Sequence, residues 1–226
     1  LGDLGNPTAA PLAVSGAFTL SGVSALNFAT LAPAVGTIPL ISYGSFSDFA
    51  NLSLGTLPAG VSGLLVNNTA ASTIDLLVTN VSLPRWNGNL SGVWNVGTTA
   101  NWVDTITDQP TTFTNGAPAV FNDLATGTTD VVVNTAVAPG SMTVNNETLA
   151  YTVAGTGSIG GAGGLTKSGA GSLSISTANT YTGPTVLSGG TTTIDSLANV
   201  GAASAIGAGS AGTGSLVFNG GSLVYV

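Results

Sequence analysis

The residues that could carry out chemistry are few in this chain. Its 226 residues include no histidine and no cysteine, so the commonest general base and the commonest metal ligands are missing. A serine nucleophile of the usual kind would lack its histidine partner. The nine acidic residues are scattered, and the closest local group is Asp104 with Asp108, extended by Asp123. These three are weak candidates for a Ca²⁺ site, without the dense acidic loops that calcium usually requires. The sequence therefore predicts no catalytic residue, no metal centre and no cofactor.

One lysine stands next to a serine, Lys167–Ser168, which is the pair that a serine–lysine nucleophile would need. The pair lies in the text LTKSG, between a short apolar-polar alternation and a glycine turn. We therefore expect Lys167 to be an exposed side chain of a strand, and not a catalytic base.

Three tryptophans follow one another at an even spacing of eight, at Trp86, Trp94 and Trp102. Exposed indole rings stack on sugars, whereas tryptophans in a stretch rich in Gly and Asn more often anchor loops from inside. We expect buried anchors, with glycan stacking by these three rings as the alternative. The Asn-x-Ser/Thr sequons are candidates for glycosylation; they begin at Asn51, Asn67, Asn80, Asn89 and Asn146.

The composition excludes several classes of protein. Charged residues make up 5% of the chain, with two basic and nine acidic residues, against about 25% in average soluble proteins. Disorder is disfavoured because 43% of the residues are hydrophobic. Nucleic acid is excluded as a partner, since neutralising phosphates requires Lys and Arg. The longest apolar runs are too short for a transmembrane helix, which needs ~18 residues.

The segments expected to form elements are all short and are separated by Gly, Pro, Asn and Ser. In residues 1–83 the candidate strands are 17–20, 25–28, 39–43, 52–54, 64–66 and 74–78. This part is predicted to be a strand-rich solenoid segment or a sandwich-like one. Residues 84–128 are a less regular Trp-rich module of loops and strands, and residues 129–226 are a β-solenoid repeat segment.

The repeat segment shows two interleaved periods. One series of strand centres is Val132, Thr152, Ser174, Ile194 and Val217, and the other is Thr143, Thr166, Leu187 and Ile206. Two series with the same step of ~20 residues are typical of a coil that stacks rungs. The predicted fold is therefore all-β, a parallel β-solenoid or β-helix with the Trp-containing module in its middle.

The texts LTKSGAGSLSIS at 165–176 and ANTYTGPTVLSGGT at 178–191 resemble the autotransporter-associated β-strand repeat of secreted bacterial β-helix passengers. The text WNGNLSGVWNVGTTANWVD at 86–104 resembles the Trp-rich lead-in that often precedes such repeats. The resemblance covers about 84–226 and departs at Pro184, where glycine is commoner. It implies a secreted protein of the cell surface.

These observations predict a non-enzymatic, extracellular structural protein. The chain begins at Leu1 instead of Met, so we interpret it as a processed product or a piece of something longer, without its signal peptide. Its end, FNGGSLVYV, reads as an uncapped strand, so the expected partner is either another copy, stacked head to tail into a homopolymeric fibre or sheath, or the remainder of a longer passenger. The first alternative is a glycan-binding adhesin that uses surface Trp, Asn and Thr on a polysaccharide. The remote alternative is a polysaccharide-active β-helix enzyme.

Overall fold

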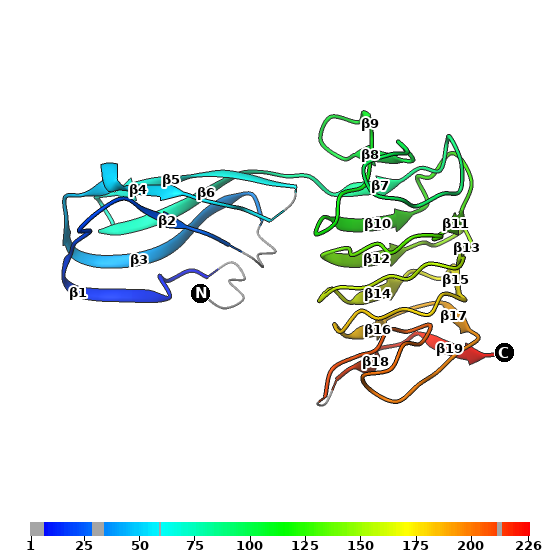
Figure 1. Ribbon diagram of the computed structural model, residues 1–226. Helices are drawn as coiled ribbons and strands as arrows, with labels where there is room; N and C mark the ends of the chain where they lie inside the picture. Colours follow the sequence, from blue (N-terminus) through cyan, green and yellow to red (C-terminus); the bar gives the residue numbers. More distant parts are fainter. Residues whose placement is uncertain (1–6, 29–33, 59, 212–213) are drawn as a thin grey trace. The chain divides into compact units, whose positions relative to one another are not determined.

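The computed structural model describes residues 7–28, 34–58, 60–211 and 214–226. Within these residues the chain is all-β, with a single 3-10 turn at Phe49–Asn51 and no α-helix. The described part accordingly holds no helix of the length and hydropathy needed to cross a membrane. The chain divides into two compact units, Leu1–Ser82 and Leu83–Val226, which are described one at a time (Figure 1).

Unit 1 is built on a mixed sheet of four strands. Its strands are β1 (Leu12–Phe18), β2 (Ser24–Leu26), β3 (Gly36–Phe46), β4 (Leu52–Leu54), β5 (Val61–Asn68) and β6 (Thr73–Val81). The order in the large sheet is β1-β3-β6-β5, with β1 parallel to β3 and the other pairs antiparallel. Strands β2 and β4 form a separate parallel pair. The antiparallel pairs mean that regular parallel rungs do not run through the described residues of this unit.

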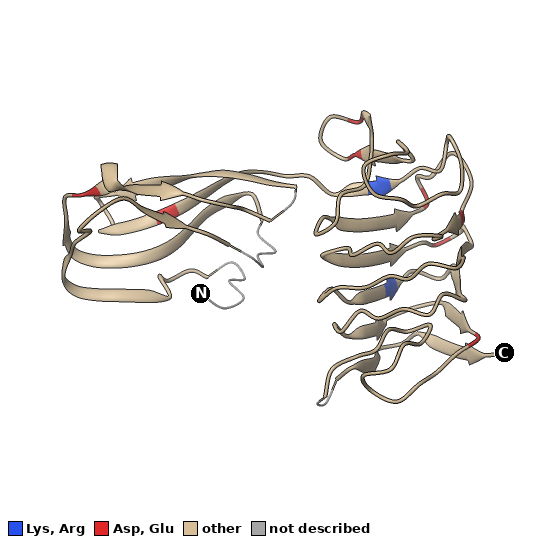
Figure 2. Cartoon of the chain, viewed as in Figure 1, with Lys and Arg blue, Asp and Glu red and all other residues tan. Residues whose placement is uncertain are grey.

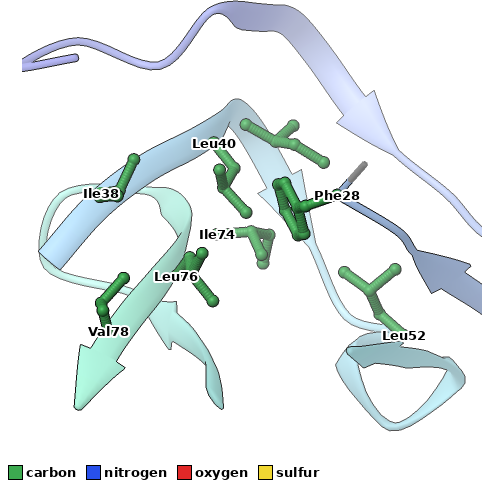
Figure 3. Packing of buried hydrophobic residues seen from close by; sticks show 8 residues of the cluster. Phe28, Ile38, Leu40, Leu52, Ile74, Leu76 and Val78 are labelled. Carbon is green, nitrogen blue, oxygen red and sulfur yellow. The ribbon is translucent and has the colours of Figure 1, made fainter. Parts of the chain in front are cut away.

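The core of unit 1 lies on one face of the large sheet. Alternate residues of β6, namely Ile74, Leu76 and Val78, point to this face and are fully buried, because successive side chains of a strand point to opposite sides. Leu52 of the small sheet and Phe28, which follows β2, complete the cluster (Figure 3). The register of β3 shifts between residues 39 and 41. A bulge of this kind moves the next side chains to the other face, and Ser42 consequently pairs with Thr73.

Unit 2 contains two sheets, and from β10 onward successive strands of the chain alternate between them. Its strands are β7 (Pro84–Trp86), β8 (Trp102–Asp104), β9 (Pro110–Thr111), β10 (Pro118–Asn122), β11 (Asp130–Val132), β12 (Ser141–Asn145), β13 (Tyr151–Ala154), β14 (Leu165–Ser168), β15 (Ser172–Ile175), β16 (Thr185–Leu187), β17 (Thr191–Ile194), β18 (Leu216–Phe218) and β19 (Ser222–Tyr225). One sheet has the order β18-β16-β14-β12-β10-β7-β8-β9, and the other has β11-β13-β15-β17-β19. From β10 onward each strand pairs in parallel with the second strand after it.

The parallel register follows the predicted period up to Ile194 and then breaks. Thr152 pairs with Ser174, and Ser174 pairs with Thr193, so the first four predicted centres of one series do lie in consecutive strands of one sheet. The last predicted centre of each series is wrong. Val217 pairs with Val186 of the other sheet, and Ile206 lies in the connection between β17 and β18. This connection is long enough that Thr185 pairs with Leu216, a step of 31 residues.

The strands of unit 2 form because apolar and small polar residues alternate within them. In β15, Leu173 and Ile175 are buried while Ser172 and Ser174 are exposed, and β14 and β17 alternate in the same way. Parallel pairing puts equivalent residues of successive strands about 4.8 Å apart, where like charges would repel. Figure 2 shows how thinly the charged residues are spread over the chain, so the stacked faces largely avoid this repulsion.

Candidate functional site

The stacked interior of the repeat is the most regular feature of unit 2. On one sheet Met142 lies beside Leu165, and Leu165 beside Thr185. On the other sheet Val153 lies beside Ile175, and Ile175 beside Ile194. All of these side chains are buried. The ladders show that the buried side chains of each strand pack on those of the next strand. The surface is therefore left to backbone edges and small polar side chains.

Glycines are required where the chain turns between the two sheets. Gly169 has φ +78°, and a Cβ built on it would clash with the carbonyl of Asn146 in the preceding turn. Gly190, with φ +62°, would meet the carbonyls of Gly169 and Gly171 in the same way. These turns are stacked so closely that side chains are excluded from them. The glycine pattern of the repeat therefore follows directly from the stacking.

Asp123 joins two successive turns of the chain. Its carboxylate accepts hydrogen bonds from the backbone N–H groups of Glu147, Thr148 and Leu149 at 2.6, 3.0 and 2.8 Å, and from the hydroxyl of Thr148 at 3.0 Å. The bond from Leu149, followed by the bond from Glu147, lowers the pKa of Asp123 to about 2, against a smaller opposing effect of burial. The residue is thus a structural clamp between turns, with its lone pairs engaged by the backbone.

Lys167 corrects the expectation of an exposed side chain, because its relative exposure is 0%. It takes an interior position in a ladder, between Val144 and Leu187. Its ammonium donates to the carbonyl oxygens of Ser168 at 2.8 Å, Gly169 at 3.0 Å and Gly189 at 3.4 Å. Burial lowers the pKa of Lys167, and the carboxylates of Glu147 and Asp123 act in the opposite direction. The buried ammonium therefore donates to backbone carbonyl oxygens of two successive turns.

The three tryptophans meet in an aromatic cluster inside unit 2. Trp86 packs edge-on against Trp102 at 5.2 Å between ring centroids, and Trp94 packs against Trp102 at 5.3 Å. Phe121 contacts all three rings. All three indoles are essentially inaccessible to solvent, so none of them presents a face to a sugar. Stacking of glycans on these rings consequently has no support in the structure, whereas their burial and mutual contacts fit the expected buried anchors.

The Trp-rich module covers the first edges of both parallel sheets. On one sheet, β7 pairs in parallel with β10, and β8 and β9 then continue antiparallel. The last of these, β9, has two residues and includes Pro110, which has no N–H to donate. On the other sheet, Trp94 N–H donates to the Val132 carbonyl at 2.9 Å, and Val132 N–H donates to Gly92 at 2.7 Å. The module therefore protects this end against further strand pairing.

The three acidic candidates for a metal site are not gathered into one. Asp104 accepts hydrogen bonds from the N–H groups of Ile106 and Thr107 within its own loop, at 2.9 and 3.0 Å. Asp108 has an 89% exposed side chain and lies 3.9 Å from the guanidinium of Arg85. Asp123 serves the turn described above. Among the described residues there is no group of three or more His, Cys, Asp or Glu side chains placed to hold an ion.

The sequon asparagines differ in accessibility. Asn89 is exposed, and Asn51, Asn67 and Asn80 are half-buried. Asn146 is fully buried, and its amide nitrogen donates to the carbonyl oxygens of Leu149 and Ser172. In the folded chain this nitrogen is inaccessible and Asn146 has a structural role, and glycosylation at Asn146 stays a prediction.

Sequence reasoning missed Asn101, which organises the tryptophan module. Its fully buried amide accepts from the N–H groups of Leu90 and Ser91 and donates to the Ser91 hydroxyl and the Val93 carbonyl. The available signal was an Asn beside a Trp in a Gly-rich stretch, which predicts an ordinary turn equally well.

Comparisons with known proteins address the repeat directly. The family model described as passenger-associated-transport-repeat matches residues 165–194. A stretch of 66 residues is 47% identical to part of the adhesin BmaC autotransporter of Brucella suis biovar 1 (strain 1330). The match covers 29% of this chain and 2% of that adhesin, so the chain corresponds to a small part of its relative. No solved structure matches the chain. Residues 165–194 thus match the passenger-associated transport repeat, which confirms the autotransporter passenger repeat recognised in this part of the sequence.

Proposed function

We propose that the chain is a segment of a secreted, non-enzymatic, adhesin-type passenger. In this proposal unit 2 is a β-solenoid that supports the outer surface of the molecule and sets the spacing along it. One observation supports this most directly. The matched repeat, 165–194, contains β14 to β17 and supplies both partners of two parallel pairs, β14–β16 and β15–β17. The repeat is therefore a stacking unit that joins one rung to the next, and adding such units lengthens the molecule without changing its cross-section.

The extracellular, cell-surface location belongs to the same proposal. The relative is named as an adhesin and an autotransporter, which places that protein at a bacterial surface. The present chain has no cysteine and little charge, and its outward rows carry Thr and Ser. A polar surface of this kind suits contact with water and neutral surfaces more than binding to a charged polymer.

The outer edges of β18 and β19 are the places where the stack can continue. Phe218 and Tyr225 on these strands are 56% and 62% exposed, although their partners Leu187 and Ile194 are buried. Further rungs of a longer passenger are the occupant that we propose. The fibre expected from the sequence requires a second copy to stack on this one. That copy would have to use the other end of unit 2, where the short strand β9 and its Pro110 disfavour further strand pairing. Sedimentation at high protein concentration separates the two, since monomers support a longer passenger and filaments support self-assembly.

Surface display tests the proposed function. The chain is placed between a secretion signal and an outer-membrane translocator, and protease resistance of the displayed chain is measured on intact cells. Leu173→Asp buries a charge in the rung and should abolish display of a resistant fragment, because a stack that cannot form cannot hold the passenger outside. Ser174→Asp is the matched control, since Ser174 is the next residue and points outward. Equal display of both variants would contradict the proposal.

A further inference from the structure

Unit 1 has a cavity that neither the repeat nor the tryptophan module explains. Its volume is about 450 Å³. It lies between the segment before β1 and the face of the large sheet opposite the core. Small residues line it, among them Ala9, Thr37, Pro39 and Thr73, and the carboxylate of Asp75 also lines it. A volume of this size suits a small organic group.

Asp75 is held at the cavity by the strand that also builds the core. Ile74 and Leu76 point into the hydrophobic cluster, so Asp75 between them points to the opposite face. It is only 3% exposed. Its Oδ2 accepts a hydrogen bond from the amide of Asn68 at 2.9 Å, while its Oδ1 has no hydrogen-bond partner among the described residues.

A buried carboxylate oxygen without a donor is costly, and such groups are normally paired with a cation or fully hydrogen-bonded. Unit 1 cannot supply the cation from a side chain, because the two basic residues of the whole chain, Arg85 and Lys167, both belong to unit 2. Lys167 is moreover buried against backbone carbonyls. The net charge of −7 makes a positive partner from outside favourable.

We propose that this cavity binds a primary ammonium or guanidinium group carried on a short apolar stem, with Asp75 as the counter-charge. The hydroxyls of Thr37, Ser42 and Thr73 also line the cavity and offer further acceptors for such a head group, while Ala9 and Pro39 line it with apolar atoms for the stem. A divalent metal ion prefers several carboxylates, and among the described residues Asp75 is the one carboxylate in the lining. A sugar ring would find no aromatic surface there. The inference is independent of the role proposed for the repeat.

Calorimetric titration of the purified chain tests the site, with N-acetyl-lysine amide as the probe and N-acetyl-norleucine amide as its uncharged counterpart. We expect binding of the lysine probe only, weakened at least tenfold by Asp75→Asn. Asp48→Asn is the matched control, because it removes the same charge from unit 1 outside the cavity lining. Agmatine and an Arg-containing tripeptide distinguish a free amine or guanidine from a side chain presented by a protein.

Two further results bear on the same proposal. Without ligand, Asp75→Asn should leave the melting temperature unchanged or raise it, because it removes a charge that the unliganded chain does not pair. A large fall in melting temperature for this variant would mean that the carboxylate is already satisfied, and would overturn the proposal. Binding of Ca²⁺ that depends on Asp75, or of methyl glucoside, with no response to the lysine probe would overturn it as well.

Discussion

Lys167 shows how a single side chain can serve the interior and the backbone together. Its stem continues an apolar ladder between Val144 and Leu187, and its ammonium reaches three carbonyl oxygens of the stacked turns. Burying an unpaired ammonium is unfavourable, which is why its pKa is lowered. The hydrogen bonds to the turn carbonyls offset part of that cost.

Replacing Lys167 separates the two contributions. Lys167→Met keeps the stem and removes the donors, so the free energy of unfolding of unit 2 should fall by about 1–2 kcal/mol. The carbonyl oxygens are left without a donor, but removal of the buried charge offsets part of that loss. Lys167→Ala also leaves a cavity and should cost about 3 kcal/mol or more. Denaturant unfolding followed by tryptophan fluorescence measures both changes, because all three Trp lie in unit 2.

The control for these variants is Thr166→Ala, the exposed neighbour on the same strand, which should change stability by less than about 0.5 kcal/mol. If Lys167→Met were more stable than the unmodified chain, the contacts with Ser168, Gly169 and Gly189 would contribute nothing to the fold.

At the scale of elements, the glycine turns determine how closely the strands can stack. Gly169 and Gly97 both have positive φ, +78° and +66°, but only Gly169 has backbone within reach of an added Cβ. Gly97→Ala should therefore cost about 1 kcal/mol, the usual penalty of an L residue in this conformation. Gly169→Ala should cost roughly 3–4 kcal/mol, because the methyl group also collides with the turn below. Denaturation midpoints give the comparison, and equal losses would show that stacking does not constrain the turn.

The elements also show which parts of the fold the sequence could predict. Strands from β11 to β17 were predictable because buried and exposed residues alternate and glycine turns separate them at a nearly constant step. The longer connection after Ile194 was not, because Ile206 is an apolar residue that falls at the expected step, although the Gly, Ala and Ser around it are typical of a loop. Burial of Lys167 was missed because lysine is normally solvated, and the ladder partners that enclose it, Val144 and Leu187, are distant in sequence.

The residues of the candidate sites also divide into those that the sequence could identify and those that it could not. The tryptophans were identifiable by type and spacing, but their burial depends on Phe113 and Phe121, which lie later in the chain, Phe113 before β10 and Phe121 within it. Asp75 gave no signal, since one acid in an apolar strand is usual on an exposed face. Its significance depends on its burial and on the lack of a hydrogen-bond partner for its Oδ1 among the described residues, which only the three-dimensional contacts reveal.

At the scale of the whole molecule, the two units have separate cores and different spectroscopic signals. Unit 1 is a mixed sheet with a single hydrophobic cluster, and unit 2 holds all three tryptophans. Changes in tryptophan emission therefore report on unit 2, whereas circular dichroism reports on both units. This makes it possible to assign pH-dependent unfolding to one part of the chain.

Unit 2 should lose stability in alkali. Burial raises the pKa of Tyr151 and of Tyr181 from 10.0 to about 12, while the phenols donate to, or share a hydrogen bond with, Asn122 and Thr185. The unfolded chain releases these protons near pH 10 and the folded chain keeps them, so the stability present below pH 10 is lost as the pH rises to about 12. Lys167 has the opposite effect, because its folded pKa is lowered, but its contribution is complete once the pH passes 10.5. Between pH 10.5 and about pH 12 the loss of stability is consequently due to the tyrosines.

Tryptophan emission recorded between about pH 9 and pH 12.5 in a fixed, moderate concentration of urea measures this effect. Tyr151→Phe and Tyr181→Phe should each flatten the alkaline transition, although each costs about 1 kcal/mol at neutral pH through the lost hydrogen bond. Tyr225→Phe is the control, because that ring is 62% exposed and should leave the transition unchanged. An alkaline transition that persists in the Tyr151→Phe/Tyr181→Phe double variant would mean that other groups unfold unit 2, and that its interior does not hold the two phenols neutral as their burial requires.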